Sequence, residues 1–219
     1  IGNSYNMAPA VSPDGGRIAM ISNKSGNFDI YIISSKDGSI IKKVISGERS
    51  SEYEEMHILK PGISWSPDGA MIAFSAKSGK SDALFIYNLK TSKVVKHRFD
   101  LEGVFRPSWA PNGNIIAFIG NNGYSSDVYT FDLDSQVLSN KTNDMFSDDQ
   151  VSWSNDGKTL YFVSDRQDGL LEIEYIDSFQ TDIFTLDVLS NEINRITNTD
   201  FNEQFPIHSK DIESGNEYI

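Results

Sequence analysis

The sequence predicts an all-β fold assembled from repeated units, and the repeats themselves are the first observation behind that prediction. A tryptophan, a tight polar turn and a short apolar strand follow one another at 63–79, 107–123 and 151–169, with a degenerate copy at 9–26. Self-similarity at a nearly fixed period is the signature of a repeat architecture. Successive copies are 54, 44 and 44 residues apart, counted from the second turn residue: Pro13, Pro67, Pro111 and Asn155.

Each copy contains the residues of a hairpin turn. The turns read Ser-Pro-Asp-Gly twice, then Ala-Pro-Asn-Gly and Ser-Asn-Asp-Gly. Proline fixes φ at the second turn position, Asp or Asn tolerates the third, and glycine adopts positive φ without steric cost. A strand with alternating apolar positions follows each turn. These strands are centred on 18–20, 72–74, 116–118 and 160–162.

Two further strands complete each unit. The third strand opens with an aspartate in every copy, at 29–33, 82–87, 127–131 and 182–186. The fourth strand is expected at 40–45, 94–99, 136–142 and 192–197. Four antiparallel strands in a repeat of about 44 residues match one blade of a β-propeller. We expect the first strand of each blade to lie innermost, near the axis.

The repeats predict a single, incomplete β-propeller domain over residues 1–219. The tail at 197–209 resembles 142–154 with one residue deleted, which places Ile207 at the tryptophan position of a further blade. Because four blades and part of a fifth do not close a ring comfortably, we expect a larger propeller whose remaining blades belong to the parent chain. The blades are expected at about 6–50, 61–100, 104–143 and 148–198, with the start of the next at 202–219.

Composition narrows the classes of partner. The chain has 31 acidic and 19 basic residues, a net charge of −12, so we expect no nucleic-acid partner, because such a surface repels phosphates. The absence of cysteine excludes disulfides, thiol catalysis and thiolate metal sites. No apolar run approaches the roughly 20 residues that a membrane-spanning helix needs, so we expect no membrane insertion of this segment.

The motifs resemble those of the TolB-type, WD-repeat-like propellers of bacterial envelope proteins. The resemblance rests on Ser-Trp-Ser-Pro-Asp-Gly at 64–69, Ile-Ala-Phe at 72–74 and Asp-Ile-Tyr at 29–31. The second blade departs from it with Asp-Ala-Leu at 82–84, and the fourth has Asn155 in place of proline. Similar blades form the non-catalytic propeller of prolyl-oligopeptidase-type peptidases. The resemblance implies a periplasmic or cell-envelope location in a bacterium.

The residues that invite a catalytic interpretation have simpler ones. The tryptophans recur at one position of the repeat, which favours packing between blades, and the strand-opening aspartates favour capping of local turns or backbone amides. His57, His97 and His208 share no metal-ligand spacing, and no Gly-x-Ser-x-Gly elbow is present. The sequence therefore predicts no catalytic residue and no metal site among these groups.

Two acidic insertions break the regularity of the repeats. They lie at 46–62 and 170–180, in connections that emerge on one rim of a propeller. One interpretation is a solvated rim. Another is a docking face for a cationic partner. A third is a set of weak Ca²⁺ sites built from oxygen ligands, and Ca²⁺ would then be the one cofactor of this segment.

These observations favour a non-catalytic scaffold that binds a protein or peptide partner. The alternative is a propeller that gates substrate access in a serine hydrolase or peptidase whose catalytic domain lies outside this chain. A third hypothesis is a propeller enzyme that acts at its own axial channel.

The binding surface is expected at the axial ends of the first strands. The residues there, three before the tryptophan position, are Ala8, Gly62, Arg106, Gln150 and Gln204. We expect a basic or amide-rich segment to dock there, against Arg106, Asp148, Asp149, Gln150, Glu203 and Gln204.

Overall fold

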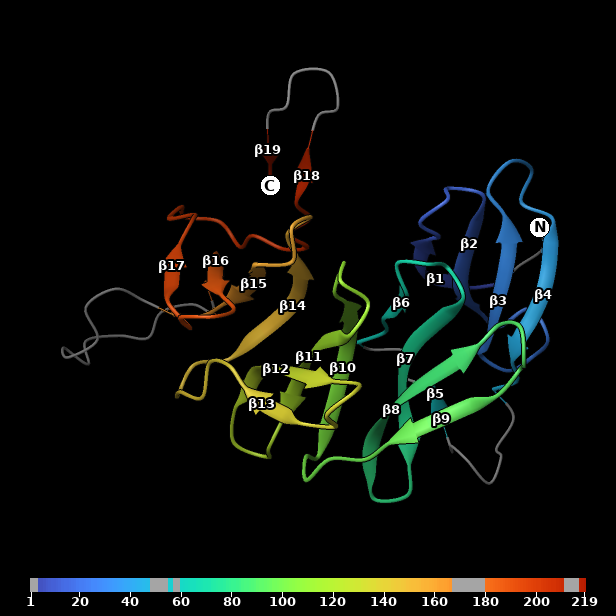
Figure 1. Ribbon diagram of the computed structural model, residues 1–219, viewed down its shortest axis with the longest axis horizontal. Helices are drawn as coiled ribbons and strands as arrows, with labels where there is room; N and C mark the ends of the chain where they lie inside the picture. Colours follow the sequence, from blue (N-terminus) through green and yellow to red (C-terminus); the bar gives the residue numbers. More distant parts are fainter. Residues whose placement is uncertain (1–3, 48–54, 57–59, 167–179, 211–216) are drawn as a thin grey trace.

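The computed structural model describes residues 4–47, 55–56, 60–166, 180–210 and 217–219 (Figure 1). Within these residues the regular secondary structure is β-strand throughout, and no helix there is long and apolar enough to cross a membrane. The strands form antiparallel sheets that follow one another along the chain, as the repeats predict.

The first sheet contains β1 (Asn6–Val11), β2 (Arg17–Ser22), β3 (Asp29–Ser34) and β4 (Ile40–Ile45). The second contains β5 (Glu55–Met56), β6 (Ile63–Trp65), β7 (Met71–Ser78), β8 (Ser81–Asn88) and β9 (Val94–His97). The third contains β10 (Gly103–Trp109), β11 (Ile115–Asn121), β12 (Ser126–Asp132) and β13 (Leu138–Asn140). The fourth contains β14 (Asp148–Trp153), β15 (Thr159–Ser164), β16 (Asp182–Asp187) and β17 (Ile193–Arg195). A two-stranded sheet of β18 (Ser209–Lys210) and β19 (Glu217–Tyr218) follows.

The sheets are arranged as the blades of an open propeller. Figure 1 shows β1, β6, β10 and β14 towards a common centre, whereas β4, β9, β13 and β17 lie at the periphery. Neighbouring first strands contact one another, β1 with β6, β6 with β10 and β10 with β14. The predicted class is confirmed: an all-β propeller segment of four blades and the start of a fifth, with the first strand innermost.

Three buried apolar clusters hold the blades together, and each takes its members from two neighbouring sheets. The tryptophans belong to these clusters, as expected from their fixed place in the repeat. Trp65 Nε1 donates to Ala10 O of the preceding blade at 2.9 Å, and Trp153 Nε1 donates to Ser108 O at 3.0 Å. Trp109 Nε1 instead donates to Gly113 O in its own turn. A buried indole fills the gap between blades and satisfies its one N–H donor there.

The strand-opening aspartates are structural, as their position predicts. Asp29 is fully buried and accepts hydrogen bonds from the Gly47 amide at 2.8 Å and the Tyr31 hydroxyl at 2.9 Å. Asp82 accepts from the amide of Val104 in the next blade at 3.1 Å. Asp29 thus ties its third strand to the segment after the fourth strand, and Asp82 ties its third strand to the first strand of the following blade.

A bulge interrupts the first strand of three blades at one place in the repeat. The pairing register shifts between Met7 and Ala10 in β1, and equivalent shifts occur in β10 and β14. The residue three before the tryptophan position has a positive φ of 49–58° in these blades. Bulges bend a strand and re-aim its side chains. The residues concerned are Ala8, Arg106 and Gln150.

In the second blade this position is Gly62, and two short strands, β5 and β6, both pair with β7. A Cβ atom on Gly62 would lie 2.5 Å from Arg106 Cα, closer than packed atoms approach. The absence of a side chain thus lets the second and third inner strands come together.

The fifth repeat begins one residue later than its sequence suggests. Phe205 has the positive φ of 56° that marks the bulge position, so His208 and not Ile207 takes the tryptophan place. The His208 ring stacks on Tyr161 at 5.5 Å, and its Nδ1 accepts from the Asn155 amide at 3.3 Å. The assignment of Ile207 is therefore wrong by one residue. The tail follows 142–154 at a constant spacing, with no deletion.

Candidate functional site

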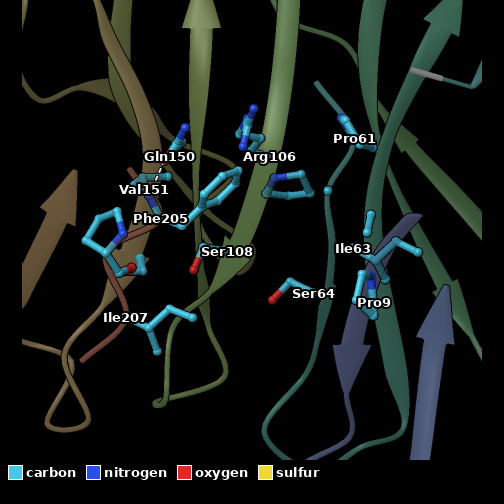
Figure 2. Close-up of a pocket in the computed structure, with 15 residues that line it drawn as sticks. Pro9, Pro61, Ile63, Ser64, Arg106, Ser108, Gln150, Val151, Phe205 and Ile207 are labelled. Atoms are coloured by element: carbon cyan, nitrogen blue, oxygen red, sulfur yellow. Dashed lines mark hydrogen bonds between the residues drawn. The ribbon is translucent and has the colours of Figure 1, made fainter. Parts of the chain in front are cut away.

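A cavity of about 290 Å³ lies where the inner strands converge (Figure 2). All five repeats contribute to it, and each does so with the residues just before its tryptophan position. The lining segments are 8–9, 61–64, 106–108, 150–152 and 205–207. These segments meet at the axis of the propeller, where a ligand would touch every blade at once.

The walls of this axial pocket are apolar and stiff. Prolines occur in four of the five lining segments, and Ile63, Val151 and Ile207 add aliphatic surface. Proline has a fixed φ and no backbone N–H, so these four positions are conformationally restricted and offer no amide donor. The prolines are Pro9, Pro61, Pro107 and Pro206.

Two of the three serines in the pocket are already used by the fold. Ser64 Oγ accepts from the Trp109 amide at 2.9 Å, and Ser152 Oγ donates to Pro206 O at 2.7 Å. Both bonds link neighbouring inner strands.

Two polar side chains, Arg106 and Gln150, lie at one end of the pocket. Figure 2 shows Arg106 and Gln150 together at this end, with the Phe205 ring beside them. Gln150 Oε1 accepts a hydrogen bond from the Phe205 amide. The Arg106 guanidinium carbon lies 5.3 Å from the centroid of the Phe205 ring, a cation–π contact. The Phe205 side chain is still 62% exposed, so a ligand can reach its ring.

Among the described residues, the charged side chains at this end are two cations and one carboxylate. Arg106 Nε lies 3.1 Å from Asp149 Oδ1, and Lys60 Nζ lies 3.3 Å from Asp149 Oδ2. One carboxylate thus faces two cations. Arg106 Nε is buried and makes no well-aligned hydrogen bond within the described residues, so the contact with Asp149 is an ion pair only. The terminal nitrogens of Arg106 make no hydrogen bond or ion pair with any described residue.

The predicted site residues separate into two groups. Arg106 and Gln150 line the axial pocket, and Asp149 is joined to it by the ion pair with Arg106. Gln204 is exposed and does not line the pocket, because Phe205 occupies the bulge position. Glu203 lies near the blade connection, where its amide donates to Thr181 O at 3.0 Å. Its Oε2 is buried and makes no hydrogen bond with any described residue.

Asp148 belongs to a buried ionic cluster away from the pocket. Its carboxylate is fully buried, and Arg166 Nη1 donates to Asp148 Oδ1 at 2.6 Å. Arg166 Nη2 also donates to Asp144 at 2.6 Å, and the guanidinium lies over the rings of Phe162 and Phe184. Burial raises the pKa of Asp148 to about 6, although the Arg166 charge opposes this. A docking partner would not reach this carboxylate.

The acidic insertions lie largely outside the described residues, which include only 46–47, 55–56, 60–62 and 180 of them. In the part of the chain that is described, no group of three or more His, Asp or Glu is placed to hold a metal ion. His97 packs on Phe131 with 4.9 Å between ring centroids, and burial lowers its pKa.

Sequence reasoning missed Lys60, Phe205 and the prolines of the pocket. The prolines carry a signal that was available: Pro9, Pro107 and Pro206 each stand two residues before the tryptophan position of their repeat. Aligning the fifth repeat on Pro206 gives the register that the structure has.

Comparison with known proteins places the fold in a family. A search of curated proteins found no matching sequence. Among solved structures, TolB from Acinetobacter baumannii superimposes with a TM-score of 0.70 at 20% identity, over 91% of this chain and 45% of that one. A putative TolB from Agrobacterium tumefaciens gives 0.68 at 16% identity, over 86% and 63%. Dipeptidyl peptidase 4 from Porphyromonas gingivalis gives 0.54 at 16% identity, over 87% and 32%.

The chain spans about half the length of the two TolB structures. These likenesses are below 25% identity, so they concern the fold. A family model described as the TolB beta propeller domain matches residues 47–173, more than half of the 219 residues. The chain therefore belongs to the TolB β-propeller family.

Proposed function

We propose that this chain is a non-catalytic binding propeller of the bacterial cell envelope and that its axial pocket holds an extended segment of a partner protein. The supporting observation is the composition of the pocket: proline-containing walls beside a mostly buried arginine whose terminal nitrogens make no hydrogen bond or ion pair with any described residue. Apolar walls with a few convergent polar groups are typical of binding sites. The envelope location rests on the family alone.

The electrostatics of the pocket favour a partner segment that carries a carboxylate. The sequence suggested a basic or amide-rich segment, because Asp148 and Asp149 were expected to make the mouth acidic. Asp148 is instead buried against Arg166, and Asp149 is shared by Lys60 and Arg106. Among the described residues, the mouth therefore has two cations against one carboxylate. Guanidinium groups bind carboxylates through paired hydrogen bonds, and an apolar neighbour in the segment would lie against Phe205.

Binding of labelled peptides tests this proposal. The probes are three fluorescein-labelled hexapeptides that differ only at one central position, which is Glu, Gln or Lys between leucines. A hydrogen bond to a charged group contributes about 1.5–3 kcal/mol, so we expect the Glu peptide to bind at least about tenfold more tightly than the Gln peptide. Arg106→Gln should abolish this preference. Lys36→Gln, a charge loss in the turn after β3, should preserve it.

Three outcomes would contradict the proposal. They are tighter binding of the Lys peptide, a preference for Glu that survives in Arg106→Gln, and cleavage of a probe by the purified chain. The gating role in a hydrolase is the second candidate, because a peptidase is among the structural neighbours. A Gly-x-Ser-x-Gly elbow in the parent gene, together with no peptide affinity for the isolated segment, would favour that role.

A further inference from the structure

A second hollow lies at the border of the second and third sheets, away from the axial pocket. Its volume is about 880 Å³, which is within the usual range for small-molecule sites. It is formed by the β7–β8 turn, the β9–β10 connection and the β11–β12 turn. The lining residues are Lys80, Ser81, 99–102, Asn122 and Tyr124.

The backbone around this groove is held firmly. The connection between β9 and β10 is fastened on both sides, because the Asp82 amide donates to Glu102 O at 3.3 Å and the Glu102 amide donates to Asn121 O at 2.8 Å. Below it, Phe99 stacks on Phe118 at 5.2 Å, and Leu101 is buried. The floor of the groove is therefore apolar and fixed.

Tyr124 is the most exposed large hydrophobic residue of the described part of the chain, at 99%. Its loop is nevertheless rigid: Asn122 Oδ1 accepts from the amides of Tyr124 and Ser125 at 2.9 and 3.0 Å, and the Gly123 amide donates to Asn121 Oδ1 at 2.8 Å. A large apolar ring is thus presented to solvent by a turn with little freedom to bury it. Such a ring is a ready platform for the apolar face of a ligand.

Three charged side chains of the groove are unused by the fold. Within the described residues, the side chains of Lys80, Asp100 and Glu102 have no recorded hydrogen bond or ion pair. Together they offer one ammonium donor and two carboxylate acceptors beside the aromatic ring. The mixture of signs disfavours a polyanion, and the three-residue metal cluster that a cation would need does not occur in this part of the chain.

We propose that this groove binds a neutral saccharide. Sugar hydroxyls both donate and accept hydrogen bonds, so they satisfy carboxylates and an ammonium in one ligand. One face of a pyranose ring carries C–H groups that pack on an aromatic ring, and Tyr124 is positioned to receive it. Asp100, Glu102 and Lys80 then bind the hydroxyls. This inference is independent of the axial pocket and of the function proposed for it.

Saturation-transfer NMR on the purified chain tests the inference, with millimolar cellobiose, maltose, lactose and N,N′-diacetylchitobiose as probes. We expect at least one disaccharide to receive saturation and to bind with a Kd that titration can measure. Tyr124→Ala should weaken binding at least tenfold, whereas Tyr124→Phe should stay within about twofold, because the ring is kept. Asp100→Asn combined with Glu102→Gln should weaken binding at least fivefold.

Tyr5→Ala is the matched control, because Tyr5 is 72% exposed but does not line the groove. It should leave binding unchanged, and all variants should keep the wild-type unfolding midpoint, since these side chains are exposed. The inference is overturned if none of the four sugars receives saturation. It is also overturned if binding survives Tyr124→Ala or is lost equally in Tyr5→Ala.

Discussion

Replacing Arg166 by methionine should make the stability of this chain respond to pH in a predictable way. Arg166 is the partner of the buried Asp148, and removal of one member of a buried ion pair costs about 3–5 kcal/mol, because the other charge is left uncompensated. Methionine keeps an apolar stem against the rings of Phe162 and Phe184, so loss of packing is kept small.

The pH dependence follows from the raised pKa of Asp148. Because that pKa is about 6, above the ordinary value of 3.8, the stability associated with the protonated carboxyl is fully present below about pH 4 and is lost as the pH rises through 6. In the wild type this loss stops above pH 6, where Arg166 supports the ionised form. Without Arg166 we expect the carboxyl to stay protonated at pH 7, so the loss continues. Between pH 6 and pH 7 the variant therefore loses about 1.4 kcal/mol of stability that the wild type keeps.

Urea unfolding followed by tryptophan fluorescence measures both quantities. The cost of Arg166→Met should be about 1.4 kcal/mol larger at pH 7 than at pH 5. Arg98→Met is the control, because Arg98 donates to the Ser78 hydroxyl at 2.9 Å and has no recorded carboxylate partner within the described residues. Its cost should be the same at both pH values. Equal costs for Arg166→Met at the two pH values, or a larger cost at pH 5, would refute the reasoning.

Three further substitutions test the packing of the blades, two by the same unfolding assay and one by amide hydrogen exchange. Trp65→Phe should cost about 1–3 kcal/mol, because Ala10 O loses its donor in a buried place; a cost near zero would show that water replaces the indole. Gly113→Ala should cost about 1–2 kcal/mol, since φ is +82° there, and Gly113→Asn should cost less; the reverse order would contradict the turn assignment. Lys141→Met should speed amide exchange around Val188, whose carbonyl accepts from Lys141 Nζ at 3.2 Å, and unchanged exchange would contradict this link.

The architecture could be predicted from the sequence because its determinants are local and repeated. The turn residues fix where each hairpin lies, and a tryptophan marks the end of the inner strand in three of the blades. The buried aspartates were also predictable, since each opens a third strand at the same place. Each of these features is determined by a few residues that are neighbours in the sequence, so the sequence pattern alone is enough to predict it.

The charge of the axial mouth could not be predicted, because it depends on distant pairings. Asp148 and Asp149 are adjacent in sequence, yet successive residues of a strand point to opposite faces. Asp148 meets Arg166 inside the fourth sheet, while Asp149 faces the axis and meets Lys60 from the second blade. Counting acidic residues along the rim assigns both carboxylates to one surface, although only Asp149 pairs with Arg106 of the pocket.

The register of the fifth repeat has the largest consequence for the proposed ligand. A shift of one residue moves a side chain to the other face of a strand. With Ile207 at the tryptophan position, the axis would receive the amide of Gln204, and the mouth would be polar throughout. With His208 there, the axis receives the ring of Phe205, which lies over Arg106. A cation beside an accessible aromatic ring selects a segment that is both acidic and apolar, so the register decides which class of partner the pocket suits.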